Sequence, residues 1–99
     1  MFVMLTATYP YNKTVEVVNA FIKQQETPPP AFMKILYVLA TSSPSSAKVY
    51  ALIEIEAGKE YEGLKEITKR QTYFINVEGY NYLAEVVLSA EEAIPLLGL

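Results

Sequence analysis

The chain has 99 residues and a formal net charge of −3 at pH 7, and hydrophobic residues make up 52% of it. This length fits one domain covering residues 1–99, and the hydrophobic content excludes a disordered chain. The acidic balance and the scattered lysines do not provide the basic patch that nucleic-acid binding needs. The sequence contains no cysteine and no histidine, which excludes thiolate and imidazole chemistry and the metal sites built from those residues. We therefore expect no metal, no cofactor and no nucleic-acid partner.

Extended and helical patterns alternate along the chain. Runs rich in β-branched and aromatic residues predict four strands, at residues 2–9, 32–41, 48–57 and 80–88. Apolar residues at helical spacing predict two longer helices, at residues 13–25 and 59–76. The prolines at 28–30 prevent the first helix from continuing. Ser89 and Glu92 have the spacing of a capping box, which predicts a short C-terminal helix.

The order of these elements indicates the topology. A helix follows the first strand and another follows the third, so both helices make crossover connections. Right-handed crossovers leave one economical strand order, 4-1-3-2, with both helices on one face of the sheet. We therefore predict an α+β fold, a ferredoxin-like βαββαβ sandwich with an antiparallel sheet and a short C-terminal helix.

The second predicted helix is expected to be amphipathic. Tyr61 and Ile67 belong to its apolar side, whereas Lys69 and Arg70 are expected on a face in contact with water. Glu66 precedes Arg70 by four residues, the spacing that favours an ion pair on a helix.

The face of the sheet without helices is too apolar for contact with water. The strand at 32–41 is apolar on both sides, with one row consisting of Met33, Ile35, Tyr37 and Leu39 and the other of Phe32, Leu36, Val38 and Ala40. A monomer would expose an apolar patch of roughly several hundred Å² or more, which is beyond what soluble monomers usually tolerate. We therefore predict a homodimer that buries this open sheet face.

The C-terminal tail carries further apolar residues that need a partner: Ile94, Leu96, Leu97 and Leu99. The alternative to a homodimer is a monomer whose C-terminal segment covers its own sheet.

Polar residues on the open face are candidates for a ligand-binding site. The candidates are Thr6, Thr8, Tyr50, Glu54 and Glu85. Glu54 lies among apolar strand residues, where a carboxylate is costly to bury without a partner and is suited to general acid or base chemistry. The alternative is that Glu54 reaches the rim of the sheet and pairs with Lys34 or Lys48.

The chain resembles the dimeric α+β barrel superfamily, and within it an uncharacterised family of single-domain proteins of about 100 residues. The likeness is carried by the opening strand at 2–10, the prolines at 28–30, the Ala-Leu-Ile-Glu run at 51–54 and the closing segment at 89–97. The resemblance implies a ferredoxin-like fold and a dimer. Members of this superfamily include haem enzymes, cofactor-free monooxygenases and lactone isomerases. Those that hold haem typically use a histidine, which this chain lacks.

Together these features predict a small homodimeric protein that binds a small apolar or aromatic ligand, either between helices and sheet or between two sheets. One alternative is a cofactor-independent isomerase or monooxygenase with Glu54 as base and Tyr50 positioning the substrate. Another is a purely structural dimer without a ligand. The apolar run at 2–7 is too short to span a membrane, so we expect no membrane contact and a cytoplasmic location.

Overall fold

The computed structural model of the protein describes residues 1–98, and Leu99 of the apolar tail lies outside the described residues. The strands are β1 (Phe2–Pro10), β2 (Met33–Ser42), β3 (Ser46–Ile55) and β4 (Asn81–Val87). The helices are α1 (Thr14–Gln25), α2 (Glu60–Gln71) and α3 (Ala90–Ala93). Short 3-10 turns adjoin them, at Tyr11–Lys13, Thr72–Phe74 and Ile94–Leu97. All predicted elements are present, with slightly different ends.

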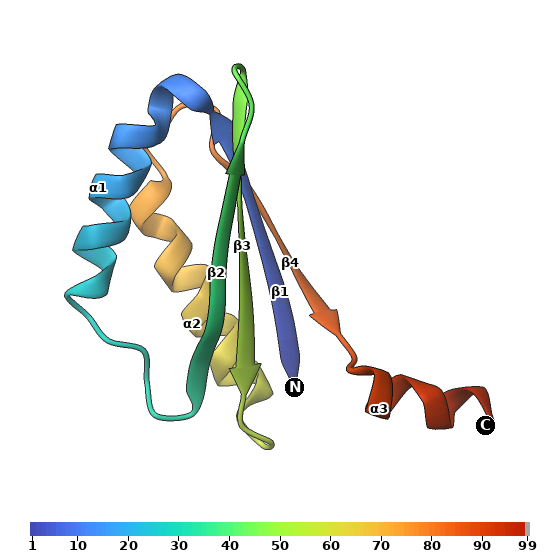
Figure 1. The fold of residues 1–99 in the computed structure, drawn as a ribbon. Coiled ribbons are helices and arrows are strands. Elements are labelled where there is room, and N and C mark those ends of the chain that lie inside the picture. The colour runs from blue at the N-terminus through green and yellow to red at the C-terminus, as the bar shows by residue number, and fades with distance from the viewer. Residues whose placement is uncertain (99) are drawn as a thin grey trace.

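The four strands form one antiparallel sheet in the order β2-β3-β1-β4. Read from β4, this is the order 4-1-3-2 that the sequence predicts. Both α1 and α2 lie on the same side of the sheet, and the opposite side carries no helix (Figure 1). The protein is therefore a small α+β domain with an antiparallel four-stranded sheet.

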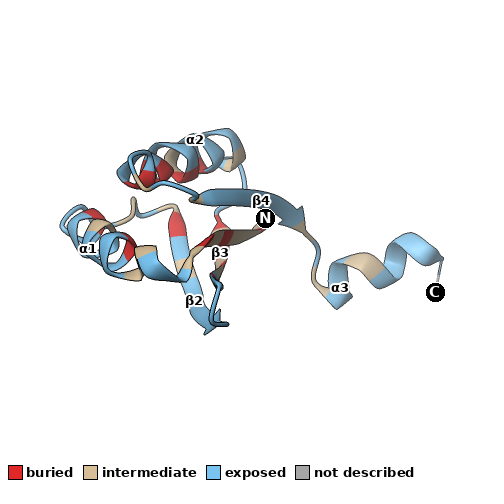
Figure 2. Cartoon of the chain, turned by 90° about the horizontal axis from the view of Figure 1, so that it is seen from above, coloured by how far each residue is buried: buried red, intermediate tan, exposed pale blue. Residues whose placement is uncertain are grey.

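The hydrophobic core lies between the two helices and the sheet, where the buried residues gather (Figure 2). Val3, Ile53 and Ile55 from the sheet pack there with Ile67 from α2. Gly63 allows α2 to approach β3 closely, because a Cβ added to Gly63 would lie only 2.8 Å from Cγ1 of Ile55. The core thus depends on a helix position that has no side chain.

The predicted alternation of side chains along β2 is wrong beyond Ile35. The register of β2 against β3 shifts between Ile35 and Tyr37, so Tyr37 pairs with Leu52. An extra residue in a strand reverses the faces that follow it. Val38 and Ala40 therefore lie on the helix side, and Tyr37 lies on the open face, together with Leu39.

The predicted faces of α2 are wrong at two positions. Tyr61 is exposed, whereas Arg70 is only 6% exposed. The helix packs against the sheet along Gly63 and Ile67, and the next position of that stripe, one turn later, is occupied by Arg70. The predicted ion pair is confirmed, with Nε of Arg70 3.2 Å from Oε1 of Glu66.

The C-terminal arm, residues 89–98, projects away from the rest of the domain (Figures 1 and 2). Its start is fixed by the predicted capping box, which is confirmed: Ser89 Oγ accepts from the Glu92 N–H, and the Glu92 carboxylate accepts from the Ser89 N–H. The radius of gyration is 14.9 Å, against about 13 Å for a compact domain of this length. The alternative in which the tail covers its own sheet is therefore wrong.

Within residues 1–98, the helices are too short or too polar for any of them to cross a lipid bilayer.

Candidate functional site

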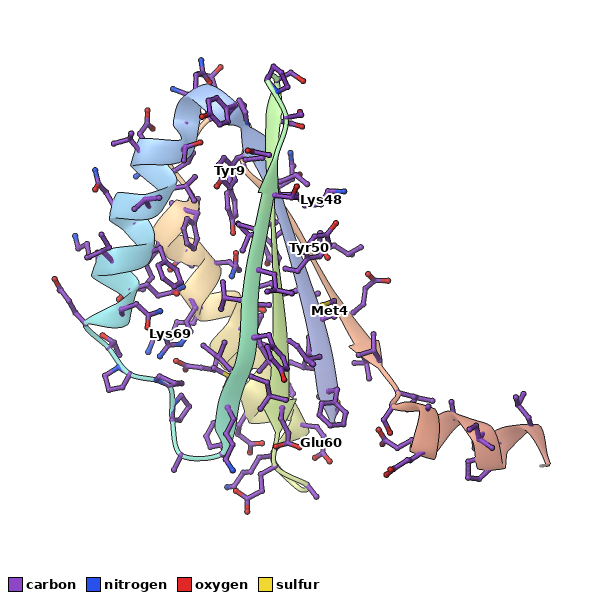
Figure 3. All side chains as sticks on the ribbon, in the orientation of Figure 1. Met4, Tyr9, Lys48, Tyr50, Glu60 and Lys69 are labelled. Atoms are coloured by element: carbon purple, nitrogen blue, oxygen red, sulfur yellow. The ribbon has the colours of Figure 1, made fainter. Side chains whose placement is uncertain are left out.

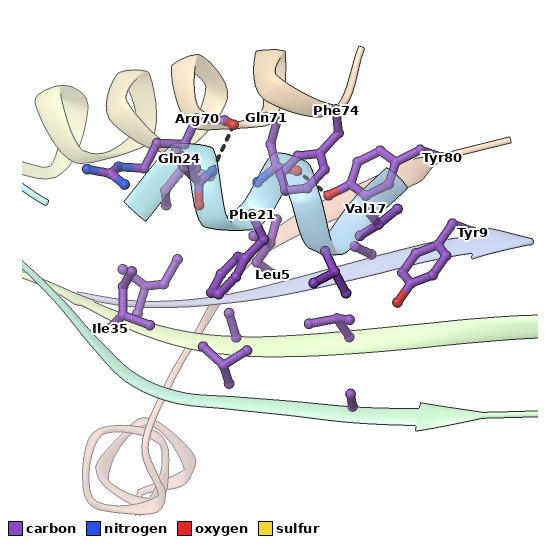
Figure 4. Close-up of a pocket in the computed structure, with 18 of the residues that line it drawn as sticks. Leu5, Tyr9, Val17, Phe21, Gln24, Ile35, Arg70, Gln71, Phe74 and Tyr80 are labelled. Atoms are coloured by element: carbon purple, nitrogen blue, oxygen red, sulfur yellow. Dashed lines mark hydrogen bonds between the residues drawn. The ribbon is translucent and has the colours of Figure 1, made fainter. Parts of the chain in front are cut away.

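A cavity of about 230 Å³ lies between α1, α2 and the sheet (Figure 4). Leu5, Ile35 and Ala51 line it from the sheet, and Val17 and Phe21 line it from α1. These side chains point inward because strand residues alternate between faces and because the helix turns its apolar side to the sheet. The wall is therefore almost entirely apolar.

The cavity opens to solvent where α1 faces β2. Val18 and Phe21 of α1 and Val38 of β2 line the cavity, and all three are substantially exposed. The cavity is therefore not sealed at this edge.

One end of the cavity is formed by stacked aromatic rings. Phe74 and Tyr80 have ring centroids 4.7 Å apart at an interplanar angle of 9°. Tyr9 stacks on the Tyr80 ring at a centroid distance of 6.4 Å. The Tyr80 hydroxyl donates to Oε1 of Gln71 at 2.6 Å, and burial raises the pKa of this phenol well above its usual value. This end offers flat apolar surfaces with a fixed phenol.

The roof of the cavity contains three buried polar side chains, those of Gln24, Arg70 and Gln71. Nε2 of Gln24 donates to the backbone carbonyl of Arg70 at 2.9 Å, which ties α1 to α2. The Arg70 guanidinium donates from Nη2 to the carbonyl oxygen of Thr27 at 2.8 Å and from Nε to Glu66. Its Nη1 is buried and has no hydrogen-bond partner among residues 1–98.

The five predicted site residues lie on the open face of the sheet, and none of them lines this cavity. Tyr50 and Thr6 are directly opposite each other in the register of β1 and β3. Figure 3 shows Tyr50 and Met4 on the side of the sheet opposite to Tyr9. Thr8 is opposite Lys48, and the Lys48 ammonium is 5.9 Å from the centre of the Tyr50 ring.

The two carboxylates on the open face are on different strands and in different rows. Glu54 is opposite Phe2 on β1, and Glu85 is opposite Met4. Lys34 is the register partner of Glu54, but in the described part of the chain neither Lys34 nor Lys48 forms an ion pair with it. Residues 1–98 also contain no cluster of three acidic side chains that could hold a metal ion. A role for Glu54 stays a prediction.

The polar roof of the cavity was not predicted from the sequence. Gln24 and Arg70 look like ordinary surface residues of amphipathic helices when only their polarity is considered. Arg70 lies three residues after Ile67 and seven after Gly63, which is the spacing of one helix face. That spacing is the feature of the sequence that could have indicated the burial of Arg70.

We expect Tyr80→Phe to weaken the dependence of stability on alkaline pH. The raised pKa keeps the folded-state phenol protonated, whereas an unfolded tyrosine ionises near pH ~10. The contribution of Tyr80 is therefore complete below pH ~10 and is lost as the pH rises through the folded-state value. At neutral pH, Tyr80→Phe should lower the free energy of unfolding by about 1 kcal/mol, because the hydrogen bond to Gln71 is lost. Above pH ~10, the unfolding free energy of the variant should fall less steeply than that of the unmodified chain.

Urea unfolding at a series of pH values measures this difference, with Tyr61→Phe as the matched control because Tyr61 is exposed. Equal slopes for Tyr80→Phe and the unmodified chain would contradict the assignment.

No protein-family model matches the chain, and no curated protein matches it. Among solved structures, it is similar to the C-terminal domain of the MgtC protein from Mycobacterium tuberculosis, with a TM-score of 0.49 and 6% identity over 90% of this chain and 92% of that one. It is also similar to the de novo designed protein Foldit4, with a TM-score of 0.48 and 11% identity over 89% of this chain and 100% of that one. Both TM-scores are below 0.5, so neither likeness carries an argument.

Proposed function

We propose that this protein binds a small apolar or aromatic ligand in the cavity between α1, α2 and the sheet. The main support for this proposal is an apolar cavity of about 230 Å³ that opens to solvent. Protein interiors are packed as densely as organic crystals and rarely leave a void larger than a water molecule. An apolar cavity of ~150 Å³ already accepts benzene, so this cavity has room for a one- or two-ring compound.

The aromatic end of the cavity supports a planar ligand. Phe74 and Tyr80 are held parallel by their stacking, and Gln71 fixes the Tyr80 hydroxyl. A ring inserted beside them gains offset-stacked or edge-to-face contacts beyond the area it buries.

Filling the cavity tests this proposal. Ala51 lies on its floor, and Ala51→Leu should weaken ligand binding about tenfold or more by occupying the space, while leaving the chain folded. Indole is the probe, because the chain contains no tryptophan and indole fluorescence therefore reports only the probe.

The matched control is Ala84→Leu. Ala84 is in β4, where it pairs with Leu5 of β1, and it does not line the cavity. This variant should therefore bind indole as the unmodified chain does. Failure of the unmodified chain to bind indole would support a purely structural role, and equal binding by Ala51→Leu would place the probe elsewhere. Either result contradicts the proposal.

We also propose that the protein is a ferredoxin-like homodimer, of the dimeric α+β barrel type, that buries its open sheet face. Large apolar side chains on that face are strongly exposed in one chain: Tyr37 is 63% exposed, Leu39 60% and Leu83 56%. They form a continuous surface with Met4 and Leu52, which lie beside them in the register. A face-to-face pair of sheets would bury roughly 800 Å² per chain, the size of a standard interface.

The C-terminal arm supports the same assembly. Ile94, Leu96 and Leu97 are exposed on a segment that points away from its own domain. In a homodimer the arm begins at the end of β4, beside the buried face, and its apolar side chains can pack on the second copy. The candidate residues of the open face, Tyr50 and Glu54 among them, would then lie in the interface rather than in the ligand cavity.

A further inference from the structure

We infer that the ligand carries a carboxylate and that Arg70 recognises it at the polar end of the cavity. This inference rests on the proposed function and specifies the ligand class for that same site. The shape of the cavity indicates an apolar body, and the unused capacity of Arg70 indicates the head group.

Arg70 is the only arginine of the chain, and it is buried in the wall of an otherwise apolar cavity. Such burial is unusual, because arginine is almost never enclosed without partners. Two of its three nitrogens are engaged: Nε donates to Glu66, and Nη2 donates to the carbonyl of Thr27. Nη1 has no partner among residues 1–98, so a charged donor is left unused inside the protein.

The missing partner must be an acceptor. A guanidinium has five N–H donors and no acceptor, whereas an ionised carboxylate has acceptor positions only. A carboxylate therefore matches Nη1 better than an amide, which presents its own donors, and the bond gains from the charge on both groups. Glu66 binds the guanidinium at Nε rather than at Nη1. The Glu66 side chain is more exposed to solvent than the Arg70 side chain. The carboxylate of Glu66 therefore stays partly hydrated while Nη1 remains available.

The arrangement of the cavity suits a molecule with two different ends. Arg70 and Gln24 lie at one end, and Phe74, Tyr80 and Tyr9 lie at the other (Figure 4). A ring packed against the aromatic end directs a carboxylate on a short chain toward Arg70. The Arg70 side chain already lines the cavity, and in this proposal it shifts so that the buried Nη1 meets the head group.

The test compares phenylacetate with phenylacetamide, which share a ring and a chain and differ in the charge of the head group. Each compound displaces indole from the protein, and the loss of bound indole gives its affinity. We expect phenylacetate to bind about tenfold more tightly than phenylacetamide. Indole binding is measured first in each variant. Arg70→Met should remove the preference for phenylacetate, and Lys69→Met, which removes a charge from the neighbouring exposed position, should retain it.

The outcomes separate this inference from the proposed function. If indole binds and the unmodified chain does not prefer phenylacetate, the carboxylate inference is wrong and the apolar site stands. If indole does not bind to the unmodified chain, the proposed function is wrong. Arg70→Lys serves where Arg70→Met does not fold: it keeps the charge but loses the planar donor fork, so the preference should shrink. An undiminished preference in both variants would overturn the role of Arg70.

Discussion

Ile55→Ala should lower the free energy of unfolding by about 2–5 kcal/mol, a large part of the ~5–15 kcal/mol that holds a domain folded. Ile55 is 1% exposed and fills the space directly above Gly63, where α2 comes closest to β3. Removing three carbons there leaves a void, because the helix cannot move nearer to the sheet than the remaining side chains allow. Urea unfolding followed by circular dichroism measures the loss.

Ile75→Ala is the matched control for Ile55→Ala. The same atoms are removed, but Ile75 is 76% exposed, so the expected change is within about 0.5 kcal/mol. Both variants are compared at one protein concentration, since the stability of a homodimer depends on concentration. If Ile55→Ala costs no more than Ile75→Ala, the core is not where the structure places it.

Leu52→Glu should convert the proposed homodimer to a monomer. Leu52 lies on the open face of a central strand, between Met4 and Tyr37 in the register. In the proposed interface the new carboxylate is buried without a partner, at a cost of about 3 kcal/mol or more for each chain. That cost raises the dissociation constant at least ~100-fold. Analytical ultracentrifugation over a range of micromolar concentrations measures the change.

Val15→Glu is the control for Leu52→Glu. Val15 is an equally apolar residue that is exposed on the outer side of α1, away from the open face. The variant should remain a dimer. Dissociation by Val15→Glu but not by Leu52→Glu would show that the helices, rather than the sheet, form the interface.

The topology was predictable because it depends on patterns that each element carries locally. Proline positions, turn residues and the two periodicities locate the strands and helices, and the handedness rule then leaves one strand order. The capping box of α3 was predictable for the same reason, since Ser89 and Glu92 satisfy each other within a single turn.

The cavity between α1, α2 and the sheet was less predictable than the topology, because it depends on how the elements pack. The register shift after Ile35 exchanges the two faces of β2, and nothing in an all-apolar run marks the extra residue. The burial of Arg70 depends on Gly63, which sets the face of α2 that meets the sheet. The open-face candidates are polar residues on an apolar strand face, and Tyr50 and Thr6 are neighbours there in the register. Their polarity gave no information about the cavity on the other side.

The molar mass of the unmodified chain in solution tests the central claim, that the open sheet face is covered by a second copy. Light scattering at micromolar concentration should give twice the 11.1 kDa mass of one chain. A mass equal to that of one chain would mean that this face, with Tyr37, Leu39 and Leu83, meets water, and it would contradict the proposed assembly.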